Sequence, residues 1–235
     1  MSTRLYLVNY SPVVSPAFDA GWQQTSGAGR WQMSPDKDST SVASQVSSSE
    51  NTATSPWDVL FLQAVSAPLD GAQTVSGTLK GQFRATEFAT DADYRAQLLA
   101  KVVSRDGSSV TGTSLAFDTG ALSSEFATTA TNRQFPRGGA QTLTSVSANA
   151  GDRLVIEIGY RSHNSHTTGR LAQLYTRQDD TTDLPENETA TAANNSWLEY
   201  SANLTFERPR TDVSLLAVQV AFNDDSPYGW GVIVR

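Results

Sequence analysis

Polar and apolar residues alternate along much of this chain. In the segment 76–88, small or apolar residues fall at positions 79, 81, 83 and 85, and lysine, glutamine and arginine fall between them. The segments 153–160 and 196–206 alternate in the same way. A period of two places successive side chains on opposite faces of a β-strand, so each segment is predicted as a strand with one face toward a core.

The segment 94–105 alternates as well, although it also fits a short helix. Its β-branched end and the turn residues Arg105–Ser108 favour a strand, with 110–117 returning as the second strand of a hairpin. The nearly continuous apolar run Trp57–Val65 is typical of a strand buried on both faces. With shorter strands at 4–8, 141–147 and 170–176, the pattern predicts an all-β protein, an antiparallel β-sandwich that is jelly-roll-like.

The pattern divides the chain into three regions. Residues 57–206 are expected to form the β-sandwich core domain. Residues 1–56 hold the strand at 4–8, followed by an extended arm or long surface loops. The arm or loops are expected because residues 9–56 show no regular alternation of polar and apolar positions and are rich in proline and serine. A connection of this length is uncommon in a compact domain. Either it packs on another surface, or it contains strands that the pattern does not show, with 41–46 as one candidate.

The C-terminal region, 207–235, is expected to form a β-ribbon arm. Its segments 213–222 and 228–234 are apolar and strand-like, and a turn separates them. Because a two-stranded ribbon is marginally stable alone, it must pack on its own domain or on a neighbouring molecule.

Charge and composition exclude several classes of protein. The chain has 24 acidic and 17 basic residues, for a formal net charge of −7, which argues against free nucleic acid as a partner. There is no cysteine, so disulfides and thiolate metal sites are excluded. No apolar run approaches the roughly 18 residues of a membrane helix, and the N-terminus does not read as a signal peptide.

Two loops carry candidate metal or ligand chemistry. His163 and His166 could share a metal ion, but a third ligand is usually needed and none is evident nearby, so a polar hairpin loop is favoured. The acidic loop that contains Asp179, Asp180 and Asp183 could take Ca²⁺ or a glycan. The EF-hand spacing is missing there, which favours a solvated loop.

Nucleophile signatures are absent from the sequence. There is no G-x-S-x-G elbow, no phosphate-binding loop motif and no H-E-x-x-H motif. A glycosidase pair of carboxylates is a minor alternative, because the sequence cannot place two of them across a cleft. No catalytic, cofactor-binding or metal-binding residue is therefore assigned, no cofactor is expected, and the chain is predicted not to be an enzyme.

The tryptophans suggest where the chain packs. Trp57 and Trp197 lie in predicted strands and are expected in the core. The tryptophans of the arm and of the C-terminal region are candidates for burial against another subunit, together with apolar neighbours. The predicted interface residues are Trp22, Trp31, Val213, Leu215, Val218, Val220, Tyr228 and Trp230.

Several short segments resemble a group of tailed-bacteriophage virion proteins. The similar segments are Ser15–Trp22, Thr25–Ala28, Val75–Arg84, Val102–Gly107 and Ala150–Gly159. They lie in patches from about residue 4 to about residue 206. The resemblance implies a sandwich fold and a location in the virion, after synthesis in the host cytoplasm, and it implies no catalytic residues. From Arg208 onward the chain departs from the pattern.

The expectation from sequence is therefore a non-enzymatic structural component of a bacteriophage particle. A head decoration or capsid-associated subunit is favoured, which forms homo-oligomers and contacts other virion proteins through its terminal arms. The alternative is a tail- or fibre-associated module that binds host surface glycans through exposed aromatic residues and the loop 179–188. A hydrolase ranks last.

Overall fold

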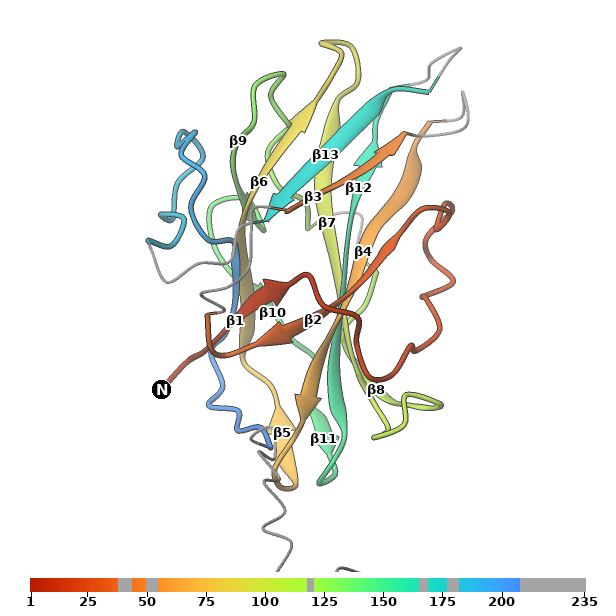
Figure 1. Ribbon diagram of the computed structural model, residues 1–235, viewed down its shortest axis with the longest axis vertical. Helices are drawn as coiled ribbons and strands as arrows, with labels where there is room; N and C mark the ends of the chain where they lie inside the picture. The colour runs from red at the N-terminus through yellow and green to blue at the C-terminus, as the bar shows by residue number, and fades with distance from the viewer. Residues whose placement is uncertain (38–43, 50–54, 118–120, 165–168, 177–181, 208–235) are drawn as a thin grey trace, which may run out of the picture.

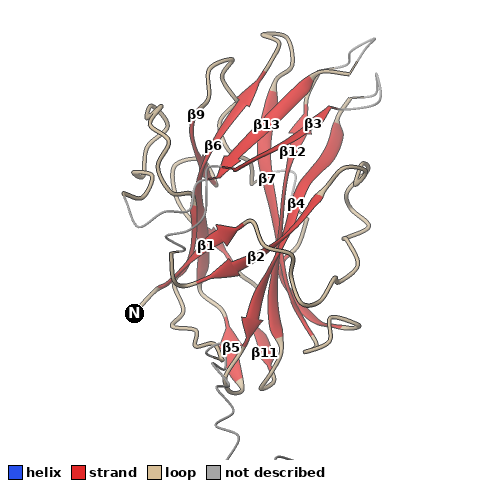
Figure 2. Ribbon diagram, in the orientation of Figure 1, coloured by secondary structure: helices blue, strands red, loops and turns tan. Residues whose placement is uncertain are grey.

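The computed structural model describes residues 1–37, 44–49, 55–117, 121–164, 169–176 and 182–207. Every helix or strand assigned in these ranges is a strand, which confirms the all-β prediction (Figure 2). No helix that could span a membrane occurs in them. The strands are β1 (Thr3–Val8), β2 (Gly29–Ser34), β3 (Ser44–Ser49), β4 (Trp57–Pro68), β5 (Gln73–Val75), β6 (Thr78–Glu87), β7 (Tyr94–Val103), β8 (Val110–Leu115), β9 (Thr131–Phe135), β10 (Gln141–Thr142), β11 (Val146–Ala148), β12 (Arg153–Ser162), β13 (Leu171–Thr176) and β14 (Trp197–Tyr200).

One large sheet has the order β3-β13-β6-β14-β1-β2-β4-β12-β7-β8, with β9 and β10 also paired to β6. Strands β5 and β11 form a small second sheet. The large sheet bends, so that β6 and β9 face β7 and β12 in a sandwich-like arrangement (Figure 1). Phe83 of β6, Phe61 of β4 and Tyr160 of β12 belong to the same buried cluster between these layers. Among the described strand pairs only β2 and β4 run parallel.

The N-terminal region is not an arm outside the sandwich, which corrects the prediction for residues 1–56. Strand β1 lies between β14 and β2, and β2 lies between β1 and β4. Trp31 and Met33 of β2 point into the core and are 6% and 2% exposed. Alternation over six residues between long loops is too short to stand out in the sequence. Strand β3 shows that the arm region holds a second strand, three residues beyond the candidate start at 41.

Other predicted strands differ in extent. The segment 141–147 forms two short strands, β10 and β11, which pair with different partners, β6 and β5. The segment 196–206 is a strand only at β14. Leu204, which lies beyond the strand, is nevertheless buried, with 5% of its surface exposed. Strands β5 and β9 were not predicted. Of the predicted C-terminal ribbon arm, only Glu207 is among the described residues.

A buried carboxylate holds the N-terminal segment 17–24 on the outer face of the sheet. Glu157 of β12 is 0% exposed, on the opposite side of the strand from the core residues Ile156 and Ile158. Its oxygens accept hydrogen bonds from Gln63 Nε2 at 2.9 Å and from Trp22 Nε1 at 2.7 Å. The backbone N–H of residue 19 donates to it at 3.0 Å.

The same carboxylate forms an ion pair with Lys101 of β7, 2.9 Å from Nζ to Oε1, and Lys101 is 4% exposed. Lys101 Nζ also donates to the carbonyl oxygen of Ala17 at 2.9 Å. Trp22 covers Gly159, where a Cβ atom would overlap the indole ring. Since a buried charge is costly unless it is paired and hydrogen-bonded, these contacts fix the path of segment 17–24.

We expect Glu157→Ala to lower the free energy of unfolding by about 3–5 kcal/mol, because Lys101 would stay buried without its partner. The double variant Glu157→Gln with Lys101→Met should lower the free energy of unfolding by less than Glu157→Ala does, because it leaves no unpaired buried charge. Arg105→Ala, which breaks an exposed ion pair with Glu207, serves as the matched control and should change the free energy of unfolding little. Urea denaturation measures all three. A loss at Glu157→Ala no larger than the control's would contradict a stabilising role for the pair.

Candidate functional site

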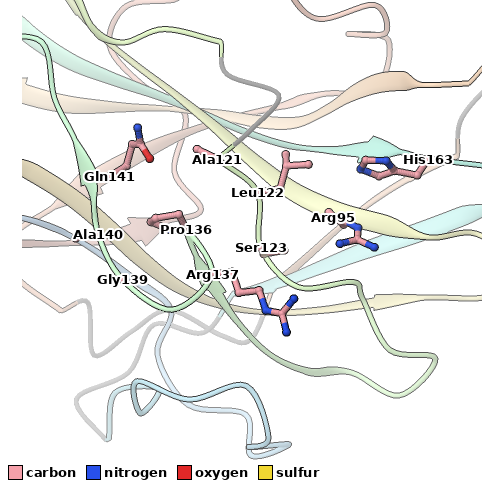
Figure 3. A pocket seen from close by; sticks show the side chains of 10 residues that line it. All are labelled: Arg95, Ala121, Leu122, Ser123, Pro136, Arg137, Gly139, Ala140, Gln141 and His163. Atoms are coloured by element: carbon pink, nitrogen blue, oxygen red, sulfur yellow. The ribbon is translucent and has the colours of Figure 1, made fainter.

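A pocket of about 550 Å³ opens on the outer surface beside β7 and the end of β12 (Figure 3). Four segments meet there: the start of β7, the loop 121–123, the turn after β9, and the residue that follows β12. Its lining residues are Arg95, Ala121, Leu122, Ser123, Pro136, Arg137, Gly139, Ala140, Gln141 and His163.

Two guanidinium groups and an imidazole ring line this pocket. Arg95 contacts Asp93 Oδ1 through Nε and Nη2, both at 3.0 Å. Arg137 is exposed, and among the described residues its side chain has no hydrogen-bond or ion-pair partner. Figure 3 shows Arg95, Arg137 and His163 reaching the pocket from three separate segments. The pocket is therefore rich in donors for an anion.

The turn after β9 presents Arg137. Phe135, the last residue of β9, is fully buried, and the N–H of Arg137 donates to the carbonyl oxygen of Leu122 at 3.0 Å. Gly138 has φ 74°, a left-handed conformation that glycine adopts readily. The backbone of the turn is thus fixed to the loop 121–123, and the arginine side chain is left at the surface.

His163 is mostly neutral at pH 7 in this setting. Partial burial of the ring lowers the pKa of His163 below its usual value, and the guanidinium groups of Arg95 and Arg161 act in the same direction. The carboxylate of Asp93 acts against them. The backbone N–H of His163 donates to the carbonyl oxygen of Asp93 at 3.1 Å, which holds the histidine beside β7.

The remaining walls are apolar or already bonded. Ala121, Leu122, Pro136 and Ala140 supply carbon surface. The Ser123 hydroxyl donates to the carbonyl oxygen of residue 124 at 2.7 Å and accepts from the N–H of residue 96 at 2.8 Å. In the part of the chain that the structure describes, no serine hydroxyl donates to a histidine ring, so no nucleophile and base pair is assembled here.

Of the three aspartates of the acidic loop only Asp183 is described, and it is paired with the chain's own cations rather than lining the pocket. Asp183 contacts Arg4 Nη1 at 2.9 Å, Lys37 Nζ at 2.8 Å and the Tyr6 hydroxyl at 3.0 Å. Burial by itself would raise the pKa of Asp183, but these hydrogen bonds outweigh it and hold the pKa below its ordinary value. The described residues hold no cluster of three or more metal-ligating side chains. Asp179, Asp180 and His166 lie outside the described residues.

The predicted interface tryptophans of the N-terminal region are inside the molecule. Trp22 is 5% exposed, covered by its hydrogen bond to Glu157 and by an edge-to-face contact with Phe117. Trp31 is 6% exposed and belongs to the main core. The structure thus buries both within a single chain, because their strands and loops pack on the sheet. The other predicted interface residues, Val213, Leu215, Val218, Val220, Tyr228 and Trp230, lie outside the described residues.

Of the three ionisable residues that line the pocket, the sequence singled out only His163. Arg95 was counted among the polar positions of its strand, which is where an outward-facing side chain belongs. Arg137 stands in the sequence Pro136–Gly139, a turn signal next to a cation, and that signal could have identified it.

Comparisons with known proteins give limited information. No family model matches the chain, and no curated protein is similar to it. Two solved structures of a CocE/NonD family hydrolase from Staphylococcus aureus are similar, with 12% and 10% identity and TM-scores of 0.45 and 0.43. They match 86% and 85% of this chain. A structure of an alpha-amino acid ester hydrolase matches 86% of it, with 11% identity and a TM-score of 0.37. The matched part is 36% of each hydrolase chain.

These findings contradict the expectation of a non-enzymatic bacteriophage component, whether a capsid-associated subunit or a tail module. The three structures named above are hydrolases, and none of these three is a virion protein. The prediction that the chain is not an enzyme is contradicted on the same ground. At TM-scores below 0.5 the likeness assigns no activity to this chain, so its function is argued from the pocket alone.

A buried carboxyl group lies at the end of β6, against the first residue of β7. Glu87 is 2% exposed, and burial raises its pKa to about 7. The carboxylates of Glu125 and Asp93 add to this effect, while the N–H of Tyr94, 3.1 Å from Oε2, and the charge of Arg133 oppose it. The folded protein therefore keeps a proton here that the unfolded chain releases near pH 4.5.

The ionisation of Glu87 therefore lowers the free energy of unfolding as the pH rises from about 4.5 to 7. Above about pH 7 this contribution no longer changes with pH. We expect Glu87→Gln, which keeps an acceptor for the Tyr94 N–H, to remove this decline. The variant should be more stable than the parent by about 1–3 kcal/mol at pH 8 and equal to it near pH 4. Urea denaturation at both pH values checks this. A difference that does not change with pH would contradict it.

Proposed function

We propose that the pocket beside β7 binds a small organic acid through its carboxylate. The observation that carries the proposal is the guanidinium group of Arg137, which has no partner among the described residues and lies in the same pocket as Arg95 and His163. A planar guanidinium offers two parallel N–H donors that match the two oxygens of a carboxylate.

The other walls of the pocket are apolar, which suggests that the rest of the ligand is apolar too. Leu122 and Pro136 are half-buried and apolar, and the alanines at 121 and 140 extend this surface. Ligand sites combine such apolar walls with a few polar groups that fix orientation. A carboxylate attached to a compact apolar body, such as an aromatic acid, fits both parts. The volume of about 550 Å³ is within the range of small-molecule pockets.

Calorimetry with benzoate tests this proposal, with benzamide as the uncharged ligand of the same shape. Benzoate should bind, and benzamide should bind at least tenfold more weakly. Arg137→Ala should weaken benzoate binding about tenfold or more, because a hydrogen-bonded charge contributes about 1.5–3 kcal/mol. Arg105→Ala removes an exposed arginine outside the pocket and is the matched control. Equal binding of the two ligands, or no effect of Arg137→Ala, would reject the proposal.

His163 should make the binding depend on pH. An anion favours the protonated ring, and the lowered pKa leaves this ring largely neutral at pH 7. Benzoate should therefore bind more tightly as the pH falls from 7 to 5.5, and His163→Ala should abolish that increase. Calorimetry at the two pH values measures it. An increase of the same size in the variant would assign the effect to another group.

The same preparations allow a test for chemistry. Release of the acid from ethyl benzoate, at a rate lowered by Arg137→Ala and unchanged by Arg105→Ala, would extend the proposal from binding to ester hydrolysis. Without such release, the proposal concerns binding alone.

A further inference from the structure

A second hollow, of about 650 Å³, lies where β2 ends beside β4, and we call it the β2–β4 groove. Much of its lining is apolar. The apolar residues include Pro12, Val13, Met33, Val65, Pro68 and Phe206. Val13 is 82% exposed, so part of this apolar surface is open to water. Exposed apolar area costs about 25 cal/mol per Å² relative to a covered state.

The described part of the chain ends beside this groove, at Glu207. Strand β2 pairs with β4 as far as Met33 opposite Ser66, and β4 continues to Pro68. Beyond the end of β2, the segment 205–207 lies beside residues 68–70, where β4 ends. Leu69 and Phe206 form an antiparallel bridge, and the N–H of residue 207 donates to the carbonyl oxygen of Pro68 at 2.7 Å. Because this segment runs antiparallel to β4, its last described residue, Glu207, lies at the end that points toward 65–67 and the end of β2, which line the groove.

Residue 207 is also anchored at the rim. The Glu207 carboxylate binds the Arg105 guanidinium through both oxygens, at 2.6 and 2.8 Å. Phe206 beside it packs against the main core. The point at which the C-terminal segment leaves the described residues is therefore fixed in position and direction.

The sequence that follows is suited to cover the groove. In the segment 213–222, eight of ten residues are apolar. Val213 is six residues beyond Glu207, a reach of up to about 20 Å for an extended chain. A tether of this length holds the segment at an effective concentration on the order of millimolar near the groove. Binding of the groove by the segment of the same chain is therefore favoured over binding by a second copy.

We propose that the apolar residues of segment 213–222 occupy the β2–β4 groove of the same molecule and cover Val13 and Phe206. The groove is then a docking site within the chain, distinct from the pocket beside β7. The C-terminal segment stabilises the end of the sheet where β2 stops.

The absence of cysteine makes the chain suitable for a crosslinking test. The full chain with Val13→Cys and Leu216→Cys is oxidised, and neighbouring positions 213, 215 and 218 are examined in turn with Val13→Cys. The control pairs Leu216→Cys with Phe88→Cys. Phe88 is 56% exposed and directly follows β6, which ends at the opposite end of the molecule from the end of β4 (Figure 1). Non-reducing electrophoresis and peptide mass spectrometry identify the products.

At least one Val13→Cys pair should form a disulfide within a single chain, at ten or more times the control's yield. Equal yields would overturn the proposal, and so would disulfides found only between two chains. Hydrogen–deuterium exchange of the full chain gives a second measurement. Leu215→Asp combined with Leu216→Asp should raise exchange at 32–36 and 65–68, while Ser214→Asp should not. Unchanged exchange at these residues would also count against the proposal.

Discussion

The arrangement of the N-terminal third depends on one carboxylate that water cannot reach. Glu157 is placed on the outer face of β12, where the sheet alone would leave it solvated, and segment 17–24 then closes over it. Once covered, the charge needs Lys101, Gln63 and an indole N–H in fixed positions, since an unpaired buried charge costs several kcal/mol. The covering segment and the sheet therefore depend on each other. The contact also explains why Trp22, which looked suited to an interface, is internal.

Strands β7 and β12 carry two kinds of outer surface along their length. Near Lys101 and Glu157 the outer face is covered and dry, whereas near Arg95 and His163 it is open. The loop 121–123 and the turn after β9 approach this open end without closing it, and Arg137 is left facing solvent. A single pair of long, rigid strands thus positions both the structural network and the candidate ligand site.

The fold was largely predictable, and the site was not. Alternation in β6, β7 and β12 was long enough to predict strands from the sequence, because ten residues give five repeats of the pattern. Strand β2, with six residues, was read as part of an arm. The pocket joins Arg95 and Arg137, which are 42 positions apart in the sequence and meet only through the sheet. The acidic loop misled for a related reason: its partners Arg4 and Lys37 are far away in sequence, so Asp183 looked unpaired.

The position of β1 between β14 and β2 has a consequence for how the protein is made. Thr3 pairs with Tyr200, so the middle of the large sheet joins two stretches that are almost 200 positions apart. During synthesis β1 has no partner on one side until β14 has left the ribosome, and β6 likewise waits for β14. Pairings of such high sequence separation slow folding, and open strand edges attract other chains in the meantime. Nascent copies of this protein are therefore expected to need protection from aggregation until β14 has been made and has paired with β1 and β6.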